Sequence, residues 1–339
     1  MECEGHAKCA ARILCLERIG IPVSWNRIAA SPMTTHTANN GISRPHRTLL
    51  LAATAMTALL ITMGGVVCVT ESGRACPDWP RCYGQIVPPM QTDAIIEYTH
   101  RVLAALTSPF IIAAALMGWT KASSIRWVSR PPVLAVVLLI AVVAFGAMAV
   151  LRGLPPWAAA LDLGLALIVL ALMLTSTIAA FSRPDNPRLA DRLSFSRAFV
   201  RLALVAAAGV FSVFVGGVLV ADGGSTVRCL GCLGVRPGPA AGGFGRWLQF
   251  GRDAISGVAA VSIAALLIAA WRTERSDAPV RRSATAAAVL GFAQIAIGAL
   301  VMMGGATIPL LVASVGTAVA LWVSLVALVV FGGLALRPA

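Results

Sequence analysis

The chain has 339 residues, of which 58% are hydrophobic and only 12% are charged, and its mean hydropathy is +0.84. Soluble domains carry about a quarter charged residues, so this composition excludes a soluble globular protein. The formal net charge of +13 does not indicate nucleic-acid binding, because the basic residues lie mainly in short loops between apolar runs, where they contact anionic lipid head groups. We therefore expect the lipid bilayer as a partner, and no nucleic acid.

The first 32 residues resemble neither a secretory signal nor a helix hairpin. Residues 1–32 lack the apolar core and the small-residue cleavage site of a secretory signal. Met33 begins a polar stretch, continuing TTHTANNGISRPHR, that is typical of a cytoplasmic lead-in. We expect the true start at Met33 and assign residues 1–46 to an N-terminal cytoplasmic tail.

Eight apolar runs follow, each long enough for the roughly 20 helical residues that cross a bilayer. A backbone in lipid must satisfy its own hydrogen bonds, so we predict an all-α integral membrane protein with about eight transmembrane helices. The expected spans are 48–70, 94–119, 132–151, a fourth from the turn at 153–156 to about 181, then 199–221, 247–271, 284–303 and 308–336.

The loops differ in charge, and this difference predicts an orientation. The loops after the second, fourth and sixth spans hold roughly a dozen Lys and Arg residues, about twice the number in the other loops. We expect a multi-pass protein of a bacterial-type plasma membrane with both termini cytoplasmic. The two cysteine-bearing loops would then face outward, where disulfides form.

An internal repeat relates the two halves of the chain. Corresponding residues lie 152 positions apart, as in Gly64-Gly65-Val66 and Gly216-Gly217-Val218, Gly146 and Gly298, and Gly153 and Gly305. We predict two pseudo-symmetric four-helix bundles, 47–182 and 199–339, joined by a cytoplasmic linker over 183–198. An even number of spans per copy places the pseudo-two-fold axis along the membrane normal.

Ionisable residues inside spans are costly and suggest function. Glu97, His100 and Arg101 lie within one turn of the second span, and the i, i+3 and i, i+4 spacings place them on one helix face. Histidine can ligate a porphyrin iron, and glutamate can move a proton. The alternative is a structural Glu97–Arg101 ion pair beside a histidine with no role.

A further carboxylate, Asp162, lies about two turns into the fourth span. At the repeat offset, polar residues of one half correspond to polar residues of the other half, within otherwise apolar helices. Two equivalent pockets, one per bundle, explain this correspondence better than chance. The offset relates Glu97 to Gln249, His100 to Arg252 and Asp162 to Ser314.

Four cysteines form two close pairs in the expected outer loops. Cys76 and Cys82 could close a short disulfide, and Cys229 and Cys232 have the C-x-x-C spacing of redox dithiols and of half a zinc site. A four-cysteine metal site across both loops is one alternative, although zinc ribbons need two C-x-x-C pairs. The other alternative is that both pairs are structural staples.

The segment GGVVCVTESGRACPDWPRCYGQIVPP, followed by EYTHR and by GLPPW with its span, resembles the heme A synthase family, which acts in cytochrome oxidase assembly. The resemblance covers about residues 50–336 and is strongest over 64–174. It implies two four-helix bundles and oxidation of the C8 methyl of heme O to the formyl of heme A. The implied partners are heme O synthase and cytochrome oxidase assembly components, and a homo-oligomer is compatible with it.

The family's functional residues carry over in part. The resemblance implies a heme O substrate in the N-terminal bundle and a heme b cofactor in the C-terminal one, each held by histidines on the second and fourth helices of its bundle. Glu97 matches a catalytic glutamate and His100 the first histidine. Cys76 and Cys82 match a cysteine pair with a role in redox chemistry or heme delivery.

The other three histidine positions of the family hold Asp162, Arg252 and Ser314 here. An arginine cannot ligate iron in the ordinary way and serine is a poor ligand, so paired histidine ligation of heme b in the C-terminal bundle is excluded. In the N-terminal bundle, His100 would be the one imidazole ligand. Asp162 would be a second ligand, a proton relay or a partner for a water on the iron.

Three functions follow from these observations. The first is a divergent heme A synthase, an oxidoreductase that uses Glu97 and His100. The second is a non-catalytic heme-binding or assembly factor of the same fold, which the replaced ligands suggest. The third is an outer-face membrane thiol–disulfide protein that uses the four loop cysteines.

Overall fold

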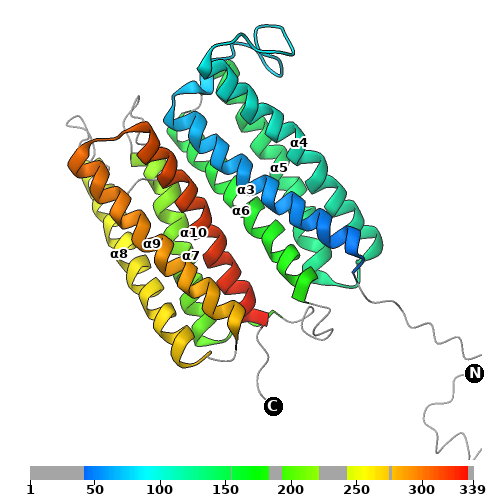
Figure 1. The fold of residues 1–339 in the computed structure, drawn as a ribbon, viewed down its shortest axis with the longest axis vertical. Coiled ribbons are helices and arrows are strands. Elements are labelled where there is room, and N and C mark those ends of the chain that lie inside the picture. Colours follow the sequence, from blue (N-terminus) through cyan, green and yellow to red (C-terminus); the bar gives the residue numbers. More distant parts are fainter. Residues whose placement is uncertain (1–41, 154, 183–192, 221–242, 275–276, 335–339) are drawn as a thin grey trace, which may run out of the picture. The chain divides into compact units, whose positions relative to one another are not determined.

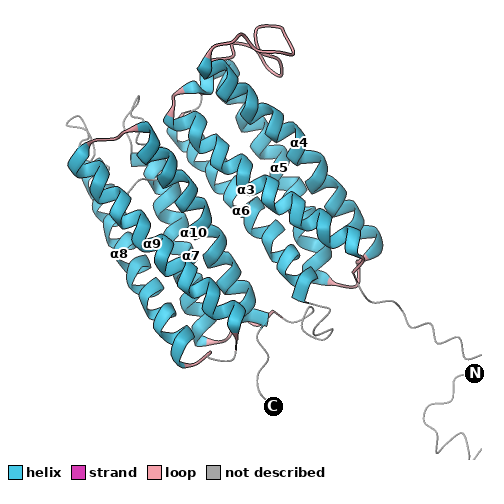
Figure 2. Ribbon diagram, viewed as in Figure 1, coloured by secondary structure: helices cyan, strands magenta, loops and turns pink. Residues whose placement is uncertain are grey.

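The computed structural model describes residues 42–153, 155–182, 193–220, 243–274 and 277–334, and these residues form long helices (Figures 1 and 2). Eight of the described helices are long and apolar enough to span a membrane, which confirms the prediction of an all-α membrane protein. They are α3 (Arg44–Val69), α4 (Thr92–Lys121), α5 (Arg126–Arg152), α6 (Pro156–Ser182), α7 (Ala198–Val220), α8 (Gly243–Arg272), α9 (Ala278–Gly304) and α10 (Ile308–Leu334).

Helix α5 begins at Arg126, six positions before the predicted start of that span, and it contains Pro131 and Pro132. Proline has no N–H, so Pro131 leaves the carbonyl of Trp127 without its usual helical donor. Ser176 on α6 supplies the missing bond, donating from Oγ to that carbonyl at 3.1 Å. A side chain from a neighbouring helix thus lets α5 extend past the prolines, as in other membrane helices.

The helices pack in two groups of four with the same internal order. In the first group, α3 packs against α4 and α6, and α5 packs against α4 and α6; the second group repeats this pattern with α7, α8, α9 and α10. Helices α4 and α6 therefore lie diagonally across the first group. The predicted tail over 1–46 and linker over 183–198 lie mostly outside the described residues, and these boundaries remain predictions.

The two groups contact each other through α3 and α6 of the first and α7 and α10 of the second. At this contact the indole Nε1 of Trp322 on α10 donates a hydrogen bond of 3.0 Å to the carbonyl of Leu167 on α6. Both residues are buried and belong to one apolar core that includes side chains of both groups. Helix α6 is therefore buried on two sides.

Candidate functional site

A cavity of about 720 Å³ lies inside the first group of helices. This volume is in the range of small-molecule and cofactor sites, roughly 300–1,000 Å³. All four helices α3, α4, α5 and α6 line it, mainly with small and apolar side chains, and Val218 of α7 also reaches it. Its ionisable lining includes Glu97, His100, Arg101 and Asp162, so the structure brings together the four ionisable residues that the sequence singled out in the N-terminal bundle.

The imidazole of His100 lines this cavity and lies against Gly64 of α3. Its Nδ1 atom is buried and has no hydrogen-bond partner among the described residues. Buried polar atoms are nearly always paired in proteins, so an unpaired ring nitrogen beside a cavity indicates a partner that the protein itself does not supply.

Asp162 of α6 lines the same cavity, and its Oδ1 atom is likewise buried without a hydrogen-bond partner among the described residues. Helices α4 and α6 begin at the same end of the group, at Thr92 and Pro156. At 1.5 Å per residue, His100 lies about 12 Å from the start of its helix and Asp162 about 9 Å. The two side chains therefore line the cavity at similar depth from diagonal helices.

Glu97 and Arg101 form the ion pair that was the structural alternative at the sequence level. Arg101 Nε donates to Glu97 Oε1 at 3.0 Å, and the two side chains are only 10% and 6% exposed. This ion pair does not exclude a role for Glu97 and Arg101 in the cavity, because both residues line it together with His100. The other carboxylate oxygen of Glu97 accepts no hydrogen bond from the described part of the chain.

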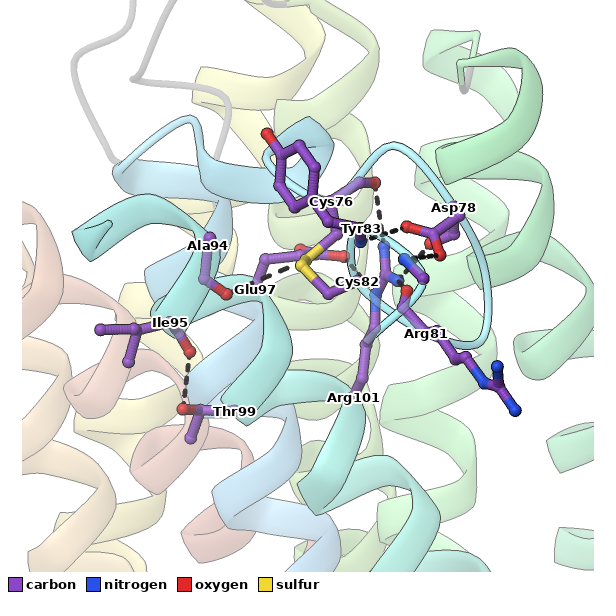
Figure 3. Close-up of a disulfide and its surroundings, with 11 residues drawn as sticks. Cys76, Asp78, Arg81, Cys82, Tyr83, Ala94, Ile95, Glu97, Thr99 and Arg101 are labelled. Carbon is purple, nitrogen blue, oxygen red and sulfur yellow. Dashed lines mark hydrogen bonds and ion pairs between the residues drawn. A yellow bond between two sulfur atoms is a disulfide. The ribbon is translucent and has the colours of Figure 1, made fainter. Parts of the chain in front are cut away.

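The loop between α3 and α4 covers one end of the cavity. Cys76 and Cys82 are joined by a disulfide and are almost fully buried, at 1% and 0% exposed. We call residues 76–82 the disulfide loop; Trp79 and Pro80 within it line the cavity. Figure 3 shows this loop around the end of the Arg101 side chain, which reaches up from α4.

Asp78 fixes the shape of the disulfide loop from within. Its carboxylate accepts hydrogen bonds from the backbone N–H of Gly84, at 2.8 Å, and of Tyr83. The bond from Gly84 is the main cause that lowers the pKa of Asp78 below its ordinary value. The residue is half-buried, and both hydrogen bonds come from residues that follow the loop closely in sequence.

The remaining cysteine predictions have different outcomes. A metal site built from four loop cysteines is wrong for this structure, because the sulfurs of Cys76 and Cys82 are bonded to each other. Cys229 and Cys232 lie outside the described residues. Cys68, at the end of α3, also lines the cavity and is itself disulfide-bonded.

In the second group, the repeat counterparts of Glu97 and His100 contact each other on α8. Arg252 Nη1 lies 3.4 Å from the side-chain oxygen of Gln249, and Gln249 Nε2 donates to Asp253 at 2.8 Å. Arg252 is buried, at 5% exposed. None of these residues lines the cavity of the first group.

Ser314, the counterpart of Asp162, belongs to a buried polar cluster between α9 and α10. Gln294 of α9 donates from Nε2 to the carbonyl of Ser314 at 2.6 Å and to Thr317 Oγ1 at 2.8 Å. Ser314 Oγ donates to Gln294 Oε1 at 3.2 Å. The hydroxyl at this position is therefore engaged within the protein.

The two groups differ in their fit to a heme. In the first, an imidazole and a carboxylate with buried unpaired atoms line one cavity of suitable volume. In the second, the corresponding positions hold a guanidinium, which cannot ligate iron, and a serine already bonded to Gln294. The residues present therefore fit a heme in the first group and do not fit one in the second.

A family model described as a cytochrome oxidase assembly protein, COX15-CtaA, matches residues 47–326. The chain belongs to this family. The match begins within α3 and ends within α10, so it includes residues of both groups of helices.

Similar curated proteins carry the name heme A synthase. The protein of Symbiobacterium thermophilum is 30% identical over 273 residues, which are 76% of this chain and 86% of that protein. The protein of Geobacillus kaustophilus is 29% identical over 257 residues, 74% of this chain and 80% of that protein. The match to the Halalkalibacterium halodurans protein, 34% identical over 151 residues, spans only 51% of that protein.

Sequence reasoning missed two features of these sites. The ionisable residues of the spans do not include Gln294, although an amide in an apolar span is itself a signal. The contacts of Arg101 with the disulfide loop had no sequence signal, because they are made to backbone carbonyls.

Proposed function

We propose that this membrane protein is a heme A synthase-like oxidoreductase that converts the C8 methyl of heme O to the formyl of heme A, with the substrate in the cavity of the first group. Family membership and the names of the relatives support the reaction class. The observation that carries the site is the cavity lined by His100 and Asp162, each with a buried unpaired atom.

His100 would bind the iron of the substrate heme, and Asp162 would lie on the opposite side of the cavity. The depth of the two residues along diagonal helices supports this arrangement. A carboxylate in place of a second imidazole leaves the iron with one histidine ligand from this chain. Asp162 would then be an anionic ligand or would accept a hydrogen bond from water on the iron.

Glu97 would handle protons at the edge of the cavity. In the net reaction, a methyl group and one water give a formyl group, four protons and four electrons. The electrons would pass to an external electron acceptor, and the protons require an acceptor near the substrate. Glu97 lies one turn from His100 and keeps one carboxylate oxygen without a hydrogen bond from the described residues. The heme iron supplies the redox chemistry when the substrate is bound.

The second group would serve as a scaffold and would hold no heme b. Arg252 and the Gln294–Ser314 contact support this difference from the family pattern. The excess of basic residues in alternate loops supports an orientation with both termini cytoplasmic and the disulfide loop at the outer surface.

The direct test is expression with a heme O source, followed by pigment extraction. Appearance of heme A is the expected result. Glu97→Ala should lower the heme A yield while the protein still binds heme, and an equal yield would remove Glu97 from the mechanism. His100→Ala should change the Soret band of the purified protein; an unchanged spectrum would reject His100 as ligand.

A non-catalytic heme-binding factor is the second candidate, favoured by the three replaced ligand positions. Purified protein with near-stoichiometric heme and no heme A formation would select it. Protein that never binds heme would reject both candidates.

A thiol–disulfide protein at the outer face has less support. Exchange requires that an attacking thiolate reach a disulfide sulfur. The residues of the Cys76–Cys82 pair are at most 1% exposed. Cys→Ser changes at positions 76, 82, 229 and 232 that leave thiol redox activity and oxidase assembly intact would dispose of this function.

A further inference from the structure

Arg101 contacts both the catalytic face of α4 and the loop that covers the cavity. Besides its bond to Glu97, it donates from Nη1 to the carbonyls of Asp78, at 2.6 Å, and Arg81, at 2.7 Å. Nη2 lies 3.4 Å from the carbonyl of Cys76. One guanidinium thus bonds a carboxylate of the helix and three backbone oxygens (Figure 3).

The three carbonyls belong to residues of the disulfide loop, between the two bonded cysteines. The disulfide closes a short ring, and this ring keeps the carbonyls directed at Arg101. The same ring carries Trp79 and Pro80, which line the cavity. The position of this cavity wall and the position of the Glu97 carboxylate therefore both depend on one side chain.

We propose that Arg101 is a positioning residue that couples the disulfide loop to Glu97, so that closure of the Cys76–Cys82 bond holds the cavity wall and the Glu97 carboxylate in one arrangement. Both cysteines are buried, so reduction requires that the loop first open transiently. It then breaks the S–S bond: two electrons and two protons from an external dithiol give two thiols, and the dithiol becomes a disulfide. The carbonyls of the opened loop no longer contact Arg101. Arg101 still bonds Glu97, but the loop no longer holds this ion pair in one position.

Only a guanidinium has the geometry for this role. Arginine offers five N–H donors in a planar fork, whereas lysine has a single nitrogen. Lysine at position 101 could pair with Glu97, but it could not bond Glu97 and three carbonyls at once. Arg101→Lys therefore preserves the charge and removes the coupling.

The first measurement is the rate at which a water-soluble phosphine reduces the Cys76–Cys82 disulfide in full-length protein in detergent, followed by thiol labelling and mass spectrometry of the loop peptide. Arg101→Lys should accelerate reduction roughly tenfold or more, because several charge-assisted hydrogen bonds to the loop are lost. Arg81→Lys is the matched control. Arg81 is exposed, its side chain points away from Arg101 (Figure 3), and its carbonyl remains in place.

The second measurement concerns the coupling to Glu97 and rests on the proposed function. Wild-type protein, oxidised or reduced, is compared with Arg101→Lys for heme A formation and heme affinity. We expect the reduced wild type and the oxidised variant to show the same altered pH profile of heme A formation, with heme affinity changed less than about threefold. Thermal unfolding of each sample identifies any variant that has not folded.

The possible outcomes distinguish failure of the Arg101 coupling from failure of the proposed heme A synthase-like function. Equal reduction rates in wild type and Arg101→Lys would overturn the coupling, even if heme A is formed. Faster reduction in Arg101→Lys and not in Arg81→Lys would support the contact with the loop, even if no heme A is formed and the proposed function fails. A pH profile that does not respond to reduction of the wild-type disulfide would overturn the connection to Glu97.

Discussion

Gly64 on α3 lies directly against the imidazole of His100 on α4. A β-carbon added at Gly64 would stand 3.2 Å from Cε1 of the ring, closer than ordinary van der Waals contact, and 3.7 Å from Nδ1. Gly216, its counterpart in the repeat, has no described atom within 4 Å of the same position. The absence of a side chain at Gly64 therefore leaves room for the His100 ring, whereas Gly216 has no such neighbour among the described residues.

We predict that Gly64→Val displaces the His100 ring and lowers heme affinity about tenfold or more, as changes next to a metal ligand commonly do. Titration of the purified protein with heme, followed at the Soret band, measures this effect. Gly216→Val is the control, because it carries the same change in helix propensity without a neighbouring ring. Equal heme affinity in the two variants would contradict the prediction.

Asp162 provides a second prediction about the same cavity. Asp162→His would offer an imidazole opposite His100, so the heme spectrum should change to that of a six-coordinate low-spin iron. Asp162→Ala should give a spectrum of a five-coordinate, high-spin iron. Absorption and electron paramagnetic resonance spectra distinguish these states. Ser314→His, at the repeat counterpart, is the control and should leave the heme spectrum as in the wild type. The same spectrum in the wild type and all three variants would place Asp162 away from the iron.

Gln294 should affect stability and not heme binding. Gln294→Leu removes the donor to the Ser314 carbonyl and to Thr317. The free energy of unfolding should fall by about 1–3 kcal/mol, because buried polar groups lose their partner. Thermal unfolding in detergent measures this loss, with Ser324→Ala as control, since Ser324 bonds only its own helix at Ala320. A loss of heme in Gln294→Leu at unchanged stability would show that the second group takes part in heme binding.

The lowered pKa of Asp78 predicts how the stability of the disulfide loop depends on pH. Its pKa is lowered in the folded loop, so the hydrogen bonds from Gly84 and Tyr83 contribute stability above the pKa of the unfolded loop. That contribution is lost as the pH falls through the lowered folded-state pKa, below about pH 4. Reduction of Cys76–Cys82 by a phosphine should therefore accelerate in wild type below this pH.

Asp78→Asn should remove this acceleration, because an amide does not change charge over the same range. Asp93→Asn, a change of an exposed carboxylate in the first turn of α4, should behave like the wild type. The same pH dependence in Asp78→Asn as in wild type would assign the effect to another group.

Much of the fold could be predicted from the sequence because lipid permits few backbone structures. The runs of apolar residues located the helices, and the offset of 152 residues related their two groups. Glu97, His100 and Asp162 were identifiable as candidate site residues because ionisable groups are rare in such helices, and the structure places all three at one cavity.

The features that were not predicted depend on contacts between distant parts of the chain. The start of α5 required Ser176, 49 positions after the carbonyl of Trp127 that it bonds. The partners of Arg101 are backbone oxygens in a loop without periodicity, so no residue type marks them. The Gln294–Ser314 contact joins two helices, and only coordinates show which amide meets which hydroxyl.

The hydrogen bond from Trp322 to the Leu167 carbonyl has a consequence for how the two halves of this protein can diverge. Leu167 lies little more than one turn beyond Asp162, on a helix shared between the cavity and the second group. The C-terminal half therefore supports one wall of the N-terminal chamber, whatever residues stand at its own repeat positions. Separating the halves at the linker would remove that support, so a truncated N-terminal half should not be expected to retain the chemistry of the whole.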